Sequence, residues 1–189
     1  RKKLVKTILV LVARVKNTRT AMEKKFNVIV IGSGPGGYVA AIKAAQLGFE
    51  TAVVERANLG GICLNWGCIP TKALLKSAQA LHYAQNGESY GFSIDGEIKV
   101  DIAKVVERSR GVSAQMSKGV DYLLKKNKVT VINGDASLTP DKKVAVKSGE
   151  GVELYEADHI ILATGARPNS LPFAPIDGKK IISYFAFRL

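Results

Sequence analysis

Both cysteines of the chain, Cys63 and Cys68, lie in one short run, residues 60–72, GGICLNWGCIPTK. A disulfide between them would close a loop of six residues, for which chain entropy gives about 2 kcal/mol of stabilisation. So small a contribution favours a chemical role, a reversible dithiol and disulfide pair in which one thiolate attacks an incoming disulfide. The competing interpretation is a pair of buried small apolar residues. The surrounding sequence has to decide between the two.

A glycine-rich turn lies between two predicted strands upstream of the cysteines. Residues 27–31, NVIVI, are a β-branched run typical of a buried parallel strand. The turn GSGPGG follows at 32–37, and small and apolar residues continue at helical spacing to residue 48. A second strand, 51–54, leads directly to Glu55. This order of strand, glycine turn, helix, strand and acid indicates a dinucleotide-binding unit.

The glycines of this turn have separate roles in such a unit. Gly32 permits the tight turn, Gly34 lets the backbone approach a pyrophosphate, and Gly37 lets the helix pack close to the strand. The phosphates then lie at the helix N-terminus, where unpaired amides and the helix dipole favour an anion. Glu55 is placed to accept hydrogen bonds from a ribose, which favours FAD or NAD over NADP. Because flavin can exchange electrons with a dithiol, whereas nicotinamide transfers hydride, the predicted dinucleotide is FAD.

The rest of the chain completes a predicted α/β fold. Residues 69–84 and 101–126 show helical spacing, and residues 128–133 read as a strand. Two polar-alternating strands, 143–147 and 152–155, form a meander, and 159–163 return to the parallel sheet. The predicted architecture is therefore a Rossmann-like FAD-binding domain with a parallel sheet, flanking helices and a small antiparallel β meander.

The composition is that of a globular protein with a basic N-terminal extension. The chain has 189 residues, of which 47% are apolar and 23% charged, and a formal charge of +12. Residues 1–21 carry seven of the excess positive charges and no acid, which leaves +5 for the remainder. No basic stripe interleaved with aromatic residues follows, and no run approaches the roughly 18 apolar residues of a membrane span. We therefore expect neither a nucleic acid nor a membrane as a partner.

Three segments together resemble the flavin disulfide reductase family: GSGPGGYVAAIKAAQLG, VVERANLGGICLNWGCIPTKALL and HIILATGARP. The form CLNxGCIPTK resembles the dihydrolipoamide dehydrogenases of this family more than its glutathione or mercuric reductases. The resemblance implies that Cys63 is the interchange thiol and that Cys68 is the thiol next to the flavin. It also implies that Lys72 lies against the flavin. Further FAD contacts are implied for Gly60, Gly61, Ala136, Thr164 and Gly165.

For the full-length parent, the resemblance implies oxidation of dihydrolipoamide to lipoamide, with NAD as the final acceptor. The substrate would be carried on a lipoyl domain of a 2-oxoacid dehydrogenase complex, and the parent would be a homodimer. Family members have a second dinucleotide domain and a dimerisation domain that supplies a catalytic histidine. Neither His82 nor His159 lies in that histidine motif, so neither is predicted to be a base. No metal site is expected.

The predicted division of the chain is a basic extension at 1–21, outside the fold, an FAD-binding domain at 22–184, and an unmatched tail at 185–189. The NAD and dimerisation domains are expected to be absent, so that these residues alone lack full turnover. One alternative is an inactive truncated relic or an interaction module, and another is a glutathione-type or mercuric reductase. The expected location is the cytoplasm, or the mitochondrial matrix if residues 1–21 are a transit peptide.

Overall fold

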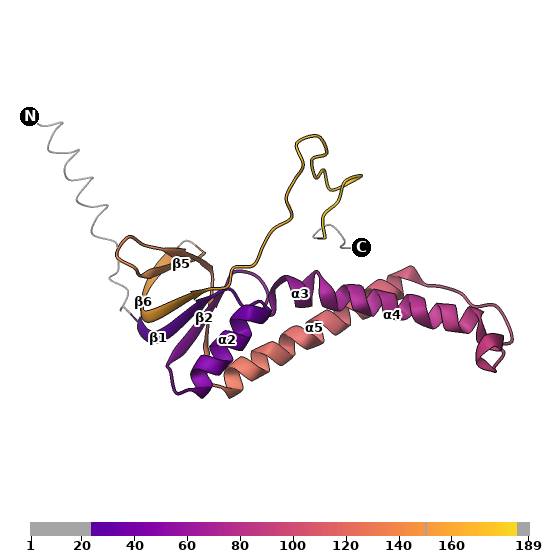
Figure 1. Ribbon diagram of the computed structural model, residues 1–189, viewed down its shortest axis with the longest axis horizontal. Coiled ribbons are helices and arrows are strands. Elements are labelled where there is room, and N and C mark those ends of the chain that lie inside the picture. Colours follow the sequence, from indigo (N-terminus) through magenta and orange to yellow (C-terminus); the bar gives the residue numbers. More distant parts are fainter. Residues whose placement is uncertain (1–23, 150, 185–189) are drawn as a thin grey trace, which may run out of the picture.

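The computed structural model describes residues 24–149 and 151–184. The predicted basic extension and the predicted tail both lie outside the described residues. One six-stranded sheet, with helices on one of its faces, forms the body (Figure 1). Its strand order is β3-β2-β1-β6-β5-β4.

The parallel part of the sheet is the predicted nucleotide-binding unit. Strand β1 (Lys24–Ile31) pairs in parallel with β2 (Thr51–Glu55) on one side and with β6 (Gly151–Leu162) on the other. Strand β3 (Thr130–Asn133) extends the parallel order beyond β2. The β-branched residues of β1 are buried on both faces of the sheet, as expected for a central parallel strand. The predicted strands at 27–31 and 51–54 are thereby confirmed, and the strand predicted at 128–133 begins two residues later, at Thr130.

The antiparallel meander differs from the prediction in its last strand. Strands β4 (Asp135–Leu138), β5 (Val144–Ser148) and β6 pair antiparallel in sequence order. Residues 152–155 and 159–163 were predicted as two strands, but both fall within or beside the single strand β6. The first part of β6, up to Tyr155, pairs with β5, and the part from Tyr155 to Leu162 pairs with β1. Tyr155 belongs to both pairings. One strand therefore belongs to both the meander and the parallel sheet, because the residues between the two predicted strands continue the pairing with β1.

Helices cover the face of the sheet that carries Val28, Val30 and Val53. Helix α2 (Pro35–Gln46) and the C-terminal part of α5 (Ile102–Lys126) lie against this face. At the N-terminus of α5, Asp101 caps the helix by accepting a hydrogen bond from the Lys104 amide at 3.1 Å. Helix α4 (Cys68–Gln85) packs along α5, and both project beyond the sheet (Figure 1). The short helices α3 (Gly61–Asn65) and η1 (Gly87–Tyr90) were not predicted.

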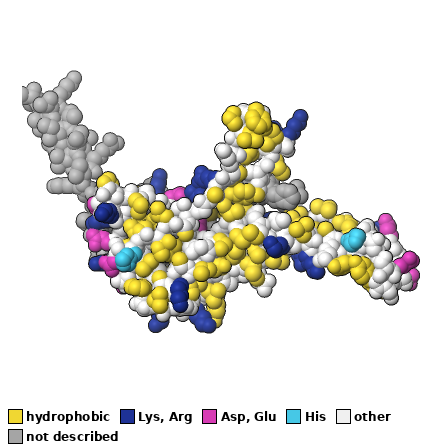
Figure 2. All heavy atoms as spheres, viewed as in Figure 1, with side chains coloured by type: hydrophobic (Ala, Val, Ile, Leu, Met, Phe, Trp, Pro, Cys, Tyr) yellow, Lys and Arg dark blue, Asp and Glu magenta, His cyan; other side chains and the backbone are white. Residues whose placement is uncertain are grey.

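The segment after β6, residues 163–184, leaves the sheet and extends away from it (Figure 1). Hydrophobic side chains gather on this segment (Figure 2), and Phe173 is 85% exposed. No helix among the described residues is both long enough and apolar enough to span a membrane.

The contact between β1 and α2 depends on a missing side chain at Gly37. A Cβ atom at Gly37 would lie 1.8 Å from the carbonyl oxygen of Gly32, the residue that follows β1. A Cβ atom at the neighbouring Gly36 would meet nothing within 4 Å. Glycine at position 37 is therefore what allows α2 to begin directly against the end of β1, as the sequence predicted.

Alanine at position 37 should lower the free energy of unfolding by about 1–3 kcal/mol, because α2 must move away from β1 to make room for the methyl group. Alanine at position 36 is the matched control. It should leave the free energy unchanged or raise it by up to about 1 kcal/mol, since glycine is a poor helix former. Urea unfolding of both variants measures the difference. Equal losses at the two positions would contradict the role given to Gly37.

Candidate functional site

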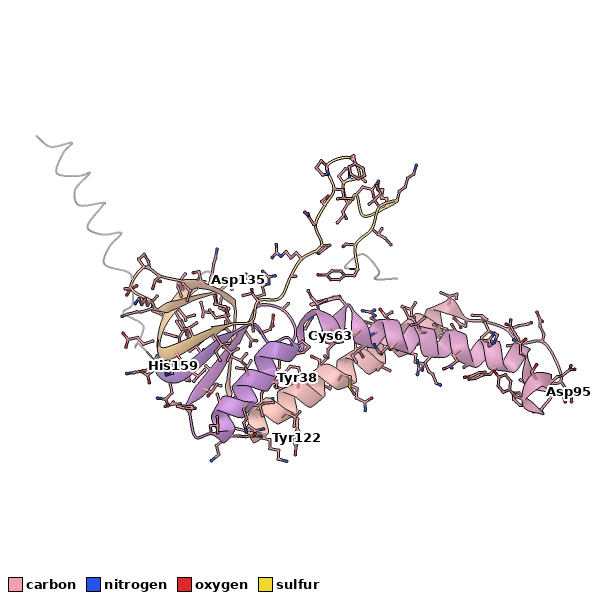
Figure 3. The ribbon with its side chains drawn as sticks, viewed as in Figure 1. Tyr38, Cys63, Asp95, Tyr122, Asp135 and His159 are labelled. Atoms are coloured by element: carbon pink, nitrogen blue, oxygen red, sulfur yellow. The ribbon has the colours of Figure 1, made fainter. Side chains whose placement is uncertain are left out.

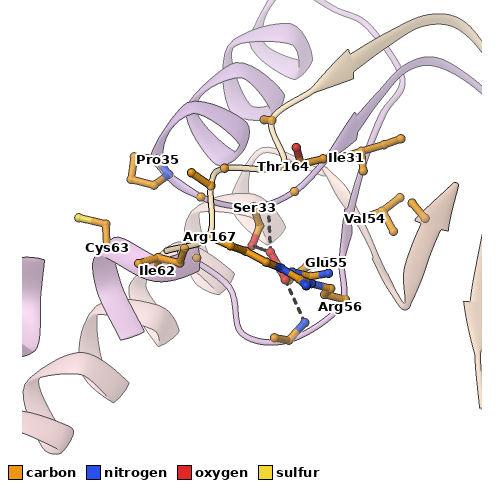
Figure 4. A pocket seen from close by; sticks show the side chains of 18 of the residues that line it. Ile31, Ser33, Pro35, Val54, Glu55, Arg56, Ile62, Cys63, Thr164 and Arg167 are labelled. Carbon is orange, nitrogen blue, oxygen red and sulfur yellow. Dashed lines mark hydrogen bonds between the residues drawn. The ribbon is translucent and has the colours of Figure 1, made fainter. Parts of the chain in front are cut away.

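A cavity of about 760 Å³ opens where β1 and β2 end (Figure 4). This volume lies within the range of small-molecule and cofactor sites. The cavity lies beside β1, whose two neighbours are β2 on one side and β6 on the other. Ligands of open parallel sheets bind at such a point, because the connections there leave in opposite directions and open a crevice. The cavity is lined by the glycine turn, by Glu55, by part of residues 59–73 (the cysteine segment), and by the first residues after β6.

The glycine turn presents backbone to this cavity. Gly32 has φ of +99° and donates its amide to the Val54 carbonyl at 2.8 Å, which closes the turn between the strands. Gly34 is the N-cap residue of α2, and a Cβ atom there would enter open space. Helix α2 has no side-chain cap and no acidic residue in its first turn. Its first residue, Pro35, has no amide hydrogen, and the other amides of the first turn have no capping side chain.

Three hydrogen bonds hold the Glu55 carboxylate at the cavity wall. The Ser33 amide and hydroxyl donate to Glu55 Oε2 at 3.0 and 2.6 Å, and the Ala57 amide donates to Oε1 at 2.9 Å (Figure 4). Ser33 is completely buried. These contacts orient a charged acceptor toward the cavity. Sequence reasoning identified Glu55 but missed Ser33, although a hydroxyl between the first two glycines of the turn was a usable signal.

The cysteine segment reaches the glycine turn through close backbone contacts. The Gly60 amide donates to the Ser33 carbonyl at 3.0 Å. A Cβ atom on Gly61 would lie 2.8 Å from the Gly34 Cα. Both glycines have positive φ, +90° and +60°, which other residues rarely adopt. These two positions therefore place α3, with Cys63, beside the turn (Figure 3).

Both cysteines are free thiols. Cys63 lies on α3 and Cys68 is the first residue of α4. The hydrogen bond with Cys68, followed by partial burial, raises the pKa of the Cys63 thiol above its ordinary value, and the Lys72 ammonium opposes this. Both thiols border the cavity, Cys63 half-buried and Cys68 exposed. The geometry thus brings both thiols to the cavity, and it does not distinguish which of them would contact a substrate.

Most of the predicted site residues line this one cavity. They are Gly32, Gly34, Glu55, Gly61, Cys63, Cys68, Ala136, Thr164 and Gly165. The predicted residues Gly37, Gly60 and Lys72 do not border it. Gly37 and Gly60 instead permit close backbone packing, and Lys72 is exposed on α4. The lining also includes Trp66, Arg56 and Arg167, which the sequence reasoning did not single out.

The two histidines lie away from the cavity. His82 is exposed near the end of α4, and His159 is exposed on β6. Neither side chain lines the cavity, and Figure 3 places His159 well apart from Cys63. This placement agrees with the expectation that neither acts as a base at this site.

Residues 26–187 match the family described as pyridine nucleotide-disulphide oxidoreductase. The dihydrolipoyl dehydrogenase of Rhizobium etli is 50% identical over 179 residues, covering 87% of this chain and 37% of the relative. That of Trypanosoma brucei brucei is 48% identical over 161 residues, covering 84% of this chain and 34% of the relative. The chain therefore spans about a third of the length of these curated relatives.

Solved structures share the same fold. LpdA from Mycobacterium tuberculosis superposes with a TM-score of 0.76 at 24% identity, covering 87% of this chain and 37% of its own. The flavoprotein disulfide reductase RclA from Escherichia coli, determined as a Cu(II) complex, gives a TM-score of 0.64 at 26% identity, covering 79% of this chain and 30% of its own. Since the family match extends over every residue that lines the cavity, the chain belongs to the pyridine nucleotide-disulphide oxidoreductase family.

Proposed function

We propose that the chain is the FAD-binding and redox-disulfide portion of a dihydrolipoyl dehydrogenase. The observation that carries this proposal is that the thiols of Cys63 and Cys68 border the same cavity as the glycine turn and Glu55. Relatives that are 44% to 52% identical to the chain are named dihydrolipoyl dehydrogenases, which supports the choice of substrate. The whole enzyme would oxidise dihydrolipoamide to lipoamide and pass two electrons to NAD.

The residues around the cavity suit FAD. The open backbone at Gly34 and the uncapped end of α2 would receive the pyrophosphate. The Glu55 carboxylate, already oriented by Ser33, would accept hydrogen bonds from the adenosine ribose. Ala136, Thr164 and residue 165 would supply further contacts from the opposite wall. When bound, FAD supplies a two-electron acceptor for the dithiol.

The cysteines would act by thiol and disulfide exchange. In the oxidised chain, a thiolate of dihydrolipoamide attacks the sulfur of Cys63, the Cys63–Cys68 bond breaks, and Cys68 leaves as a thiolate. The second substrate thiolate then attacks the substrate sulfur of the mixed disulfide, which closes the lipoamide ring and releases Cys63. The dithiol holds the two electrons removed from the substrate.

The proposed partner is dihydrolipoamide on a lipoyl carrier domain of a 2-oxoacid dehydrogenase complex, and the whole enzyme would be a homodimer. The names of the relatives support the lipoyl substrate. A carrier domain suits a thiol pair that is reached from solvent, as the exposed Cys68 and half-buried Cys63 are.

Replacing Glu55 with glutamine should weaken the affinity of the chain for FAD about tenfold or more, because a charge-assisted hydrogen bond to the ribose is lost. Glu50→Gln makes the same change of charge at an exposed position outside the cavity and should leave the affinity unaltered. Quenching of flavin fluorescence measures both. Equal affinity in the two variants would contradict the role of Glu55. A wild-type chain that takes up no FAD would contradict the proposed function and favour an inactive relic.

In the reduced chain, Cys68→Ala should lower the pKa of Cys63, because it removes the hydrogen bond that contributes most to raising it. Alkylation of Cys63 by iodoacetamide would then reach half its maximal rate at a lower pH than in the wild-type chain. Lys72→Met is the opposite control. It should move that pH upward, since the ammonium group favours the thiolate. If the pH of half-maximal alkylation in Cys68→Ala equals or exceeds that of the wild-type chain, this explanation is contradicted.

A further inference from the structure

Side chains of α5 donate hydrogen bonds to backbone carbonyls along the cysteine segment. The three accepting carbonyls lie before the first cysteine, between the two cysteines, and after the second. The bonds are Ser117 Oγ to the Leu59 oxygen at 2.8 Å, Arg110 Nη1 to the Asn65 oxygen at 3.1 Å, and Arg108 Nη1 to the Ala73 oxygen at 2.8 Å. Of these three bonds, the one from Arg110 has its acceptor between Cys63 and Cys68.

Asn65 is the residue through which the segment between the cysteines is held. It ends α3, and its side-chain amide donates to the Leu59 and Gly61 carbonyls at 3.0 and 2.9 Å. The carbonyls of the last helical turn have no intrahelical partner. Arg110 supplies a donor to the Asn65 carbonyl from α5. The turn that follows, Trp66 and Gly67, leads directly into Cys68.

The guanidinium of Arg110 is not fully satisfied in this position. Its Nε atom is buried and makes no hydrogen bond among the described residues. An unpaired buried donor costs free energy, and an apolar side chain of similar size removes that cost. A purely stabilising role therefore predicts little loss of folding stability when Arg110 is replaced by methionine. A role in the placement of the thiols predicts that the Cys63–Cys68 disulfide closes less readily.

We propose that Arg110 is a positioning residue for the dithiol, which holds the Asn65 carbonyl and so keeps Cys63 and Cys68 at the separation from which their disulfide closes. This inference rests on the proposed function of the pair as a reversible disulfide. Arg110 itself does not line the cavity, so its effect passes through the backbone of the segment. Two thiols fixed near one another close a ring more readily than two thiols on a loose loop.

The closing reaction can be followed with glutathione. One cysteine thiolate attacks a sulfur of oxidised glutathione, forms a mixed disulfide and releases one glutathione thiolate. The other cysteine thiolate attacks the protein sulfur of that mixed disulfide, forms the Cys63–Cys68 bond and releases the second glutathione. Two electrons pass from the dithiol to oxidised glutathione, and the two thiol protons go to the two released glutathione thiolates. The second step depends on the separation of the cysteines.

The test is the equilibrium constant for this reaction in the 189-residue chain. Each variant is equilibrated with glutathione at several ratios of oxidised to reduced form, quenched with acid, alkylated and analysed by mass spectrometry. Arg110→Met should lower the constant about tenfold, the scale of one hydrogen bond to a charged group. Arg110→Lys keeps a cationic donor and should stay within about threefold of wild type. Arg108→Met removes a bond outside the cysteine pair and should change the constant by less than about twofold.

An unchanged constant in Arg110→Met, or an equal fall in Arg108→Met, would overturn the inference. Urea unfolding monitors stability in parallel. If Arg110→Met does not fold, Arg110→Leu takes its place with the same expected fall, and a constant near wild type in that folded variant overturns the inference. If the wild-type chain never closes the disulfide, both the proposed function and this inference fail. If the wild-type chain closes it and Arg110→Met closes it equally well, the inference about Arg110 alone fails.

Discussion

The site depends on the close approach of two backbone loops. The Gly60 amide donates to the Ser33 carbonyl, and Gly61 lies against Gly34 without room for a side chain. This contact joins the end of β1 to the start of the cysteine segment, so that the glycine turn and the thiol pair face one cavity. Neither loop alone would couple nucleotide binding to thiol chemistry. A side chain at Gly61 would separate them, whatever the quality of each motif.

The parallel sheet and most residues that line the cavity could be predicted because their signals are local. A β-branched run buried on both faces predicts β1, and the acid at the end of β2 predicts Glu55. The close spacing of Cys63 and Cys68 predicted a redox pair, and the structure places both beside the cavity that the glycine turn lines. In each case the residue type and its distance along the chain carry the information.

Other features could not be predicted because they arise from tertiary contacts. The continuity of β6 depends on simultaneous pairing with β5 and β1, which no periodicity within 152–163 reveals. The bond from Arg110 to the Asn65 carbonyl joins residues 45 positions apart. Lys72 is exposed on α4 and does not line the cavity, and its contact with the flavin stays a prediction. The assignment of Cys63 as the interchange thiol stays a prediction.

The central claim is that substrate electrons enter through this cysteine pair. The most direct measurement is an anaerobic titration of the oxidised, FAD-loaded chain with dihydrolipoamide, following lipoamide formed, protein thiols released and flavin absorbance. The proposed function predicts that dihydrolipoamide reduces the disulfide and changes the flavin spectrum, that reduced glutathione at equal thiol concentration does so far less, and that Cys63→Ser abolishes both responses. A flavin spectrum that responds equally in the wild-type chain and in Cys63→Ser would contradict it.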